Sequence, residues 1–118
     1  MNVIYSITEY GSIQVLTINT LRDEWKNRQI LKTLHQKINS EKKYFIVDMS
    51  QLSLISSSGL NFLLSLLSMI QDEDGTLVLA NVSTRVVQVL DITKLLSVFE
   101  IQSSIDVAIQ HFSLQLAA

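Results

Sequence analysis

Two short and uniformly apolar runs, separated by a longer apolar segment, constrain the fold more strongly than any other feature of the sequence. Residues 44–47 are too few and too evenly apolar for a surface helix, and residues 76–80 repeat the pattern. Both runs are therefore predicted to be strands buried on both faces, whereas residues 61–71 have the length and composition of an apolar helix. Strands that are joined through a helix pair in parallel, by a right-handed crossover. The central part of the chain thus predicts an α/β fold.

The segment before these runs predicts a hairpin followed by a helix. Residues 3–8 and 13–18 are rich in β-branched side chains and flank a turn at residues 9–12, where Gly11 is free to adopt a positive φ. Apolar residues then recur at helical spacing between residues 23 and 39, which predicts an amphipathic helix.

Three further elements are predicted after the second buried strand: a helix, a short strand at residues 99–101 and a last helix. The candidate caps are hydroxyl residues at the start of each helix, namely Ser83 or Thr84 and Ser103 or Ser104. The predicted order is ββαβαβαβα, in a single domain that spans residues 1–118. We expect a mostly parallel sheet with the opening hairpin as its antiparallel edge and helices packed on the sheet.

Composition excludes several classes of function. A formal net charge of −2 at pH 7 provides no basic surface for a nucleic-acid backbone, and the absence of cysteine excludes a disulfide framework and a thiolate metal site. Residues 1–5 lack the features of a signal peptide, and the longest apolar stretch, residues 60–70, is too short to cross a bilayer. A soluble cytoplasmic protein without nucleic-acid binding or membrane insertion is therefore expected.

A run of three serines joins the first buried strand to the apolar helix. The run consists of Ser56, Ser57 and Ser58, followed by Gly59. A helix start leaves four backbone N–H groups without partners and carries a partial positive charge, so a serine there can cap the helix and a phosphate there is well tolerated. Ser56 or Ser57 can thus be a simple N-cap, or the run can be a cap and a switch.

The residues around this run resemble the motif of a known family. Residues 45–50 and 54–60 resemble the STAS domain family, in which an apolar strand ends in Asp and a short loop leads to Asp-Ser-Ser-Gly-Leu at the start of a helix. The best-known soluble members are bacterial anti-sigma factor antagonists. The resemblance extends across nearly the whole chain and implies a STAS-like fold. Residue by residue, Ser57 matches the serine that a partner kinase phosphorylates, and Ser58 and Gly59 match its two followers.

The chain departs from the family pattern at two places. Ser56 stands where the family motif has Asp, which removes a carboxylate beside the phosphoacceptor and leaves a neutral hydroxyl that can still cap the helix. After the second strand, residues 19–22 read Asn-Thr-Leu-Arg where members often have Gly-x-Leu-Asp, with Asp23 one position late. These departures predict a surface that is adapted to a different partner.

The apolar helix has more apolar surface than one core face requires. Its apolar residues occupy well over the roughly 100° of one buried stripe. Either neighbouring helices on the same side of the sheet cover the excess, or it forms part of a footprint for a partner protein. The candidate partner-binding residues surround Ser57 on the loop and the first helical turns, namely Ser56, Ser58, Gly59, Leu60, Asn61 and Leu64.

Other chemistry-bearing residues do not form a catalytic set. Asp48 ends a buried strand and is expected to fix the following loop by a hydrogen bond, because no nucleophile and base accompany it. His35 and His111 have no carboxylate or second ligand at metal spacing, so solvated histidines are expected. Trp25 either packs under the hairpin or is exposed for a partner. No enzyme activity, metal or cofactor is therefore predicted.

The resemblance implies a regulatory binding module. The leading hypothesis is an anti-sigma factor antagonist that docks on an ATP-binding anti-sigma serine kinase, is released when Ser57 is phosphorylated, and is reset by a serine phosphatase. The alternative is a STAS subunit of a membrane lipid or anion transport assembly that is not phosphorylated, which Ser56 in place of Asp favours. Whether the domain forms a weak homodimer stays open.

Overall fold

The computed structural model describes residues 5–19, 24–38 and 44–117. These residues form five strands and four helices, in the order β1 (Tyr5–Tyr10), β2 (Ile13–Ile18), α1 (Glu24–Lys37), β3 (Tyr44–Asp48), α2 (Ser57–Asp72), β4 (Thr76–Ala80), α3 (Thr84–Ile92), β5 (Glu100–Gln102) and α4 (Ile105–Ala117). The predicted α/β class and the predicted order of elements are both confirmed.

The strands form one sheet whose spatial order is the order of the chain, β1-β2-β3-β4-β5. β1 pairs with β2 in antiparallel fashion, and all other neighbours are parallel. Tyr10 pairs with Ile13, so the hairpin turn is shorter than predicted and consists of Gly11 and Ser12. Gly11 has the predicted positive φ, at 62°. The predicted first strand began at Val3, and residues 1–4 lie outside the described part of the chain.

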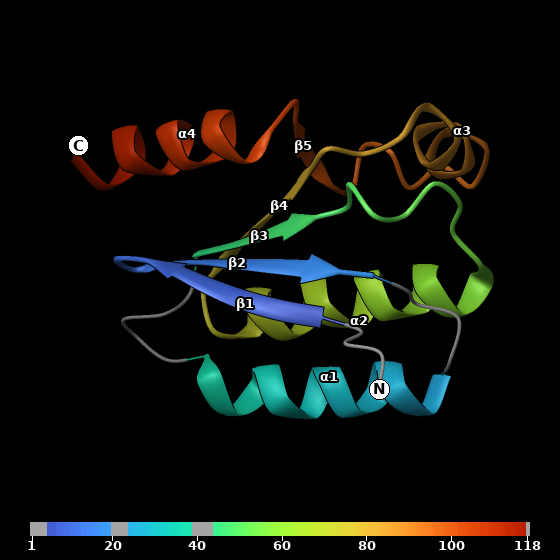
Figure 1. The fold of residues 1–118 in the computed structure, drawn as a ribbon, viewed down its shortest axis with the longest axis horizontal. Coiled ribbons are helices and arrows are strands. Elements are labelled where there is room, and N and C mark those ends of the chain that lie inside the picture. Colours follow the sequence, from blue (N-terminus) through green and yellow to red (C-terminus); the bar gives the residue numbers. More distant parts are fainter. Residues whose placement is uncertain (1–4, 20–23, 39–43, 118) are drawn as a thin grey trace.

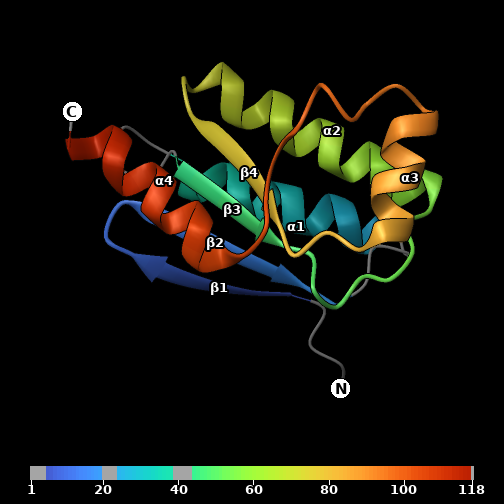
Figure 2. The ribbon, with the colours of Figure 1, turned by 90° about the horizontal axis from the view of Figure 1, so that it is seen from above.

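Helices cover both faces of the sheet (Figure 1). α1 and α2 lie side by side on one face, and α4 lies on the other face across β2, β3 and β4. Seen from above, α3 lies beyond the carboxyl ends of the parallel strands, beside the start of α2 (Figure 2). Within the described residues, no helix has the length and apolar character needed to span a membrane.

The core has two parts, one on each face of the sheet. The larger part fills the space between the sheet and α1, α2 and α3, and it includes Phe45, Phe62 and Leu79. A smaller cluster lies under α4. There Phe112 packs against Tyr44, with 5.4 Å between the centroids of the two rings. β3 contributes to both clusters through alternate residues, which confirms that this strand is buried on both faces.

Gln14 is a polar residue within this apolar interior. It belongs to β2 and is 1% exposed, yet neither side-chain polar atom has a hydrogen-bond partner in the described structure. Burying an amide without partners costs about 1–3 kcal/mol. The buried amide of Gln14 is therefore expected to destabilise the folded state.

Several element boundaries differ from the prediction. α2 begins at Ser57 rather than at Asn61: Ser56, one of the two expected N-caps, caps the helix, and the helix follows it directly. β5 spans Glu100–Gln102 rather than residues 99–101, since Phe99 turns into the main core and pairing with β4 begins at Glu100. α1 begins within one residue of the predicted start, and the predicted end at Asn39 lies outside the described residues.

Candidate functional site

Asp48 connects the carboxyl ends of three neighbouring strands. Its Oδ1 accepts hydrogen bonds from the Ser50 backbone N–H and from Asn81 Nδ2, both at 3.0 Å. Its Oδ2 accepts a hydrogen bond from Thr17 Oγ1 at 3.3 Å. Thr17 lies in β2 and Asn81 follows β4, so a single side chain ties β2 and β4 to the loop after β3. The predicted loop-fixing role of Asp48 agrees with these contacts.

These contacts favour the ionised form of the Asp48 carboxyl group. Burial alone would raise its pKa, but the hydrogen bonds from Asn81, Ser50 and Thr17 outweigh burial and hold the pKa below its ordinary value. A carboxylate whose pKa is lowered by folding stabilises the native state above its unfolded-state pKa, and this contribution is lost as the pH falls through the folded-state pKa.

Asp48→Asn is expected to lower the free energy of unfolding by about 1–3 kcal/mol at pH 7, because an amide cannot accept all of these hydrogen bonds. The difference from the wild type should begin to narrow as the pH falls below about 4, where the unfolded chain starts to bind the proton, and should be lost as the pH falls through the lower folded-state pKa of Asp48. Urea unfolding at several pH values measures both effects. Asp72→Asn, at the exposed end of α2, serves as the control and should change stability by less than about 0.5 kcal/mol. A difference in the free energy of unfolding between wild type and Asp48→Asn that stays constant down to about pH 2, roughly two units below the ordinary pKa of Asp, would contradict the ionised role.

The loop after Asp48 is anchored on both sides. Met49 donates its backbone N–H to the Ala80 carbonyl at 2.9 Å, and the side chains of Met49 and Leu52 are buried. Further along, Ser83 Oγ donates to the Ser53 carbonyl at 3.1 Å. Ser83 also caps α3, since its Oγ accepts a hydrogen bond from the Val86 N–H. The loop is thereby held against β4 and the start of α3.

Ser56 is the N-cap of α2. It has extended backbone angles, its Oγ accepts a hydrogen bond from the Gly59 N–H at 3.2 Å, and its carbonyl accepts one from the Leu60 N–H at 2.9 Å. The simple capping role therefore belongs to Ser56 and not to Ser57. It follows that Ser57, expected in the loop, is the first residue of the helix itself.

The structure brings the predicted partner-binding residues together on the first two turns of α2 and its cap. Ser56, Ser57 and Asn61 are exposed, Ser58 is half-buried and Gly59 is buried. Leu60 and Leu64 are partly buried and pack against the main core. Neighbouring elements thus cover much of the apolar surface of these two leucines, and part of each remains accessible.

Two contacts of Asp48 were missed by sequence reasoning. Thr17 pairs in register with Asp48, and Asn81 follows the residue that pairs with Asp48 on the other side. Both residues could have been predicted, because Thr17 and Asn81 lie at the carboxyl ends of the strands on either side of β3. Asn81 adopts a positive φ of 57°, which asparagine tolerates better than most residues.

The remaining candidates lie elsewhere. His35 is exposed on α1, as expected. His111, also expected to be solvated, is half-buried, and its Nε2 lies 2.9 Å from Glu100 Oε1 of β5. The described residues contain no group of three or more potential metal ligands. Trp25 is part of α1, but its side chain lies outside the described structure, as do residues 20–23 of the variant Gly-x-Leu-Asp segment.

The family is established by comparison with known domains. The model of the STAS domain family matches residues 5–108, so the chain belongs to the STAS domain family. No curated protein matches the sequence.

Solved structures agree with this family. The anti-sigma factor antagonist SpoIIAA in its unphosphorylated form is 19% identical, with a TM-score of 0.76 over 92% of this chain and 96% of SpoIIAA. A variant of RsbS from Moorella thermoacetica is 15% identical, with a TM-score of 0.82 over 97% of this chain and 98% of RsbS. A sulfate transporter family protein from Wolinella succinogenes is 20% identical, with a TM-score of 0.78 over 91% of this chain and 89% of that protein. These similarities establish a shared fold.

Proposed function

We propose that this protein is an anti-sigma factor antagonist that binds an anti-sigma serine kinase through the start of α2 and is released when Ser57 is phosphorylated. The observation that carries the proposal is the position of Ser57, which is exposed and is the first residue of α2, directly after the cap. Its match to the family phosphoacceptor and the similarity of the fold to SpoIIAA support the proposal.

The position of Ser57 suits a binding switch. A phosphate adds a charge of roughly −1.5 to −2, and the partial positive charge at the start of a helix tolerates it. The cap through Ser56 and the contacts of Asp48 do not use the Ser57 hydroxyl. Phosphorylation is therefore expected to leave the fold intact and to change only the surface that a partner meets.

The proposed partner surface combines this hydroxyl with the residues around it. It comprises Ser56, Ser58, Gly59, Leu60, Asn61 and Leu64. Asn61 is exposed beside the accessible parts of Leu60 and Leu64, so the surface offers a polar group flanked by apolar ones. Such a surface fits the docking of another protein.

The proposal also specifies where the protein acts and how the unphosphorylated form is restored. The protein acts as a single, non-enzymatic domain in the cytoplasm, where the partner kinase has ATP, and a serine phosphatase restores the unphosphorylated form. Ser56 preserves the helix cap that the family Asp would provide, but it leaves the residue before Ser57 neutral.

Incubation with the anti-sigma kinase of the same genome and ATP is expected to add one phosphate, at Ser57, because this hydroxyl is exposed and matches the family acceptor. Intact-mass and peptide mass spectrometry measure the number and position of phosphates. Ser57→Ala should abolish labelling and Ser58→Ala, at the half-buried neighbour, should retain it. Ser56→Asp should speed labelling by restoring the carboxylate of the family. Labelling of another residue, or none, would contradict the proposal.

A second candidate function is a STAS subunit of a membrane lipid or anion transport assembly. Two observations favour it: Ser56 in place of the family Asp, and the similarity of the fold to the Wolinella succinogenes sulfate transporter family protein. A chain that takes no phosphate from the kinases of its own cell but co-purifies with a membrane transport complex would support this candidate over the first.

A further inference from the structure

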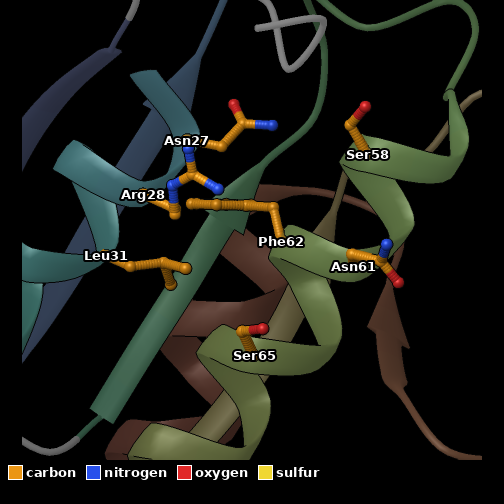
Figure 3. A pocket seen from close by; sticks show the side chains of 7 residues that line it. All are labelled: Asn27, Arg28, Leu31, Ser58, Asn61, Phe62 and Ser65. Atoms are coloured by element: carbon orange, nitrogen blue, oxygen red, sulfur yellow. The ribbon is translucent and has the colours of Figure 1, made fainter. Parts of the chain in front are cut away.

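A small hollow with polar and apolar walls lies between α1 and α2, beside the proposed phosphorylation site. It has a volume of about 190 Å³, and its lining includes Asn27 and Arg28 of α1 and Ser58 and Asn61 of α2. Figure 3 shows Arg28 beside Asn27 on the α1 side, with Phe62 extending from α2 towards α1. Because Ser58 follows Ser57 directly, the hollow adjoins the proposed phosphoacceptor.

The hollow has a positive charge and several hydrogen-bond donors. Arg28 is exposed, and the structure gives it no ion pair with a described residue. Ser58, Asn61 and Ser65 add hydroxyl and amide groups, and none of the described lining residues is acidic. The start of α2 adds a partial positive charge nearby. In a chain with a formal net charge of −2, this site is thus locally suited to an anion.

The volume of the hollow indicates which anions it can hold. Small-molecule sites in proteins usually have volumes of roughly 300–1,000 Å³. A hollow of about 190 Å³ is small for a nucleotide and large enough for one side chain. Leu31 and the buried ring of Phe62 provide apolar walls for methylene groups, and a guanidinium matches the two oxygens of a carboxylate. These features fit an aspartate or glutamate side chain.

We propose that the hollow receives the carboxylate of an acidic residue of the partner protein, with Arg28 as its counter-ion. The inference rests on the proposed function for the existence of that partner. It also explains how the switch acts. A phosphate on Ser57 would bring a charge of roughly −1.5 to −2 next to the hollow and oppose the entry of a second anion. Partner binding and phosphorylation would thus compete for the same positive charge.

The chemistry of the hollow can be tested without the partner. The probe is glutamate capped as N-acetyl and N-methylamide, titrated into the ¹⁵N-labelled protein at constant ionic strength. We expect saturable shifts of the amides of residues 58–65 and of the Arg28 Nε–H group. Capped glutamine, which lacks the charge, should bind about tenfold more weakly than capped glutamate. The Arg28→Gln variant should bind capped glutamate about tenfold more weakly than the wild type does. Arg85→Gln, at an exposed arginine of α3, is the control and should leave the affinity unchanged.

Two results of this titration would overturn the inference. One is equal affinity for capped glutamate and capped glutamine, or for the wild type and Arg28→Gln. The other is tighter binding of inorganic phosphate with displacement of capped glutamate, which would make the hollow a phosphate site. Circular dichroism of Arg28→Gln verifies that the variant is folded.

A second measurement connects the hollow to the partner. Surface plasmon resonance should show that Arg28→Gln binds the anti-sigma kinase about tenfold more weakly than the wild type, with Arg85→Gln unchanged. If the kinase binds the wild type and Arg28→Gln equally, the inference is wrong and the proposed function stands. If the kinase does not bind the wild type, the proposed function is wrong, and the capped-glutamate titration still decides whether the hollow binds a carboxylate.

Discussion

Phosphorylation of Ser57 is expected to lower the affinity for the partner kinase by about a hundredfold or more. A partner that packs on the first turn of α2 would bury the phosphate without a matching charge, which costs several kcal/mol, and each 1.4 kcal/mol, roughly, is tenfold in affinity. Isothermal titration of the phosphorylated and unphosphorylated proteins measures the difference. Ser57 is exposed and takes no part in the cap, so the circular dichroism spectrum should not change.

Substitutions in α2 test separately whether the loss of affinity depends on the added negative charge and on its position at Ser57. Ser57→Ala should bind like the wild type, whereas Ser57→Asp should bind more weakly but less so than the phosphoprotein, since it carries about one charge instead of nearly two. Ser68→Asp is the matched control, because Ser68 is exposed on the same face of α2 about 16 Å further along the helix. Equal affinity of the phosphorylated and unphosphorylated forms would contradict the switch. Equal losses in Ser57→Asp and Ser68→Asp would contradict its location.

Leu79→Ala is expected to lower the free energy of unfolding by about 2–5 kcal/mol, because it opens a cavity in the main core. Leu79 lies in β4, is 0% exposed and belongs to the cluster between the sheet and the helices α1, α2 and α3. For a domain of this size, the melting temperature should fall by roughly 10 °C or more. Differential scanning calorimetry or urea unfolding measures the loss.

Leu114→Ala is the matched control for this prediction. Leu114 lies on α4 and is 75% exposed, so its truncation should change stability by no more than about 0.5 kcal/mol. An unchanged melting temperature for Leu79→Ala would show that β4 is not a central strand.

The order of elements was predictable because each element has a distinct periodicity. The mostly apolar residues of β3 and β4 are typical of strands that are covered on both faces, and the described structure has helices on both faces of these strands. Gly11 marked the hairpin turn because few other residues adopt its positive φ without strain.

Ser56 was one of the two predicted N-caps of α2, but the first helical residue was predicted at Asn61 instead of Ser57. Three serines followed by Gly59 have low helix propensity and are typical of a loop. The hydrogen bonds to the Ser56 hydroxyl and carbonyl stabilise the first turn and outweigh that propensity. The prediction placed β5 one residue too early, because a strand of three residues has too short a pattern to fix its register. In the structure Phe99 is buried in the main core, and the strand begins at the next residue.

The residues of the candidate site came from the sequence motif, and the contacts between them came from the structure. Asp48 and Ser57 were identified from the motif, whereas Thr17 and Asn81 became apparent only from the register of three strands. Arg28 could not be identified from the sequence, because an arginine on the polar face of a helix resembles any solvated charge. Only the pairing of α1 with α2 places it at a hollow.

The strand order has a consequence for how the chain folds. Because spatial order follows chain order, each strand joins a sheet that already contains the strand made before it. Ile13 pairs with Tyr44, Tyr44 with Thr76 and Val78 with Glu100, so the three parallel pairings close loops of roughly 20 to 30 residues. Loop-closure entropy rises with length, and proteins with local contacts fold faster. The sheet can therefore grow strand by strand from its amino-terminal hairpin as the chain leaves the ribosome, without waiting for a distant segment.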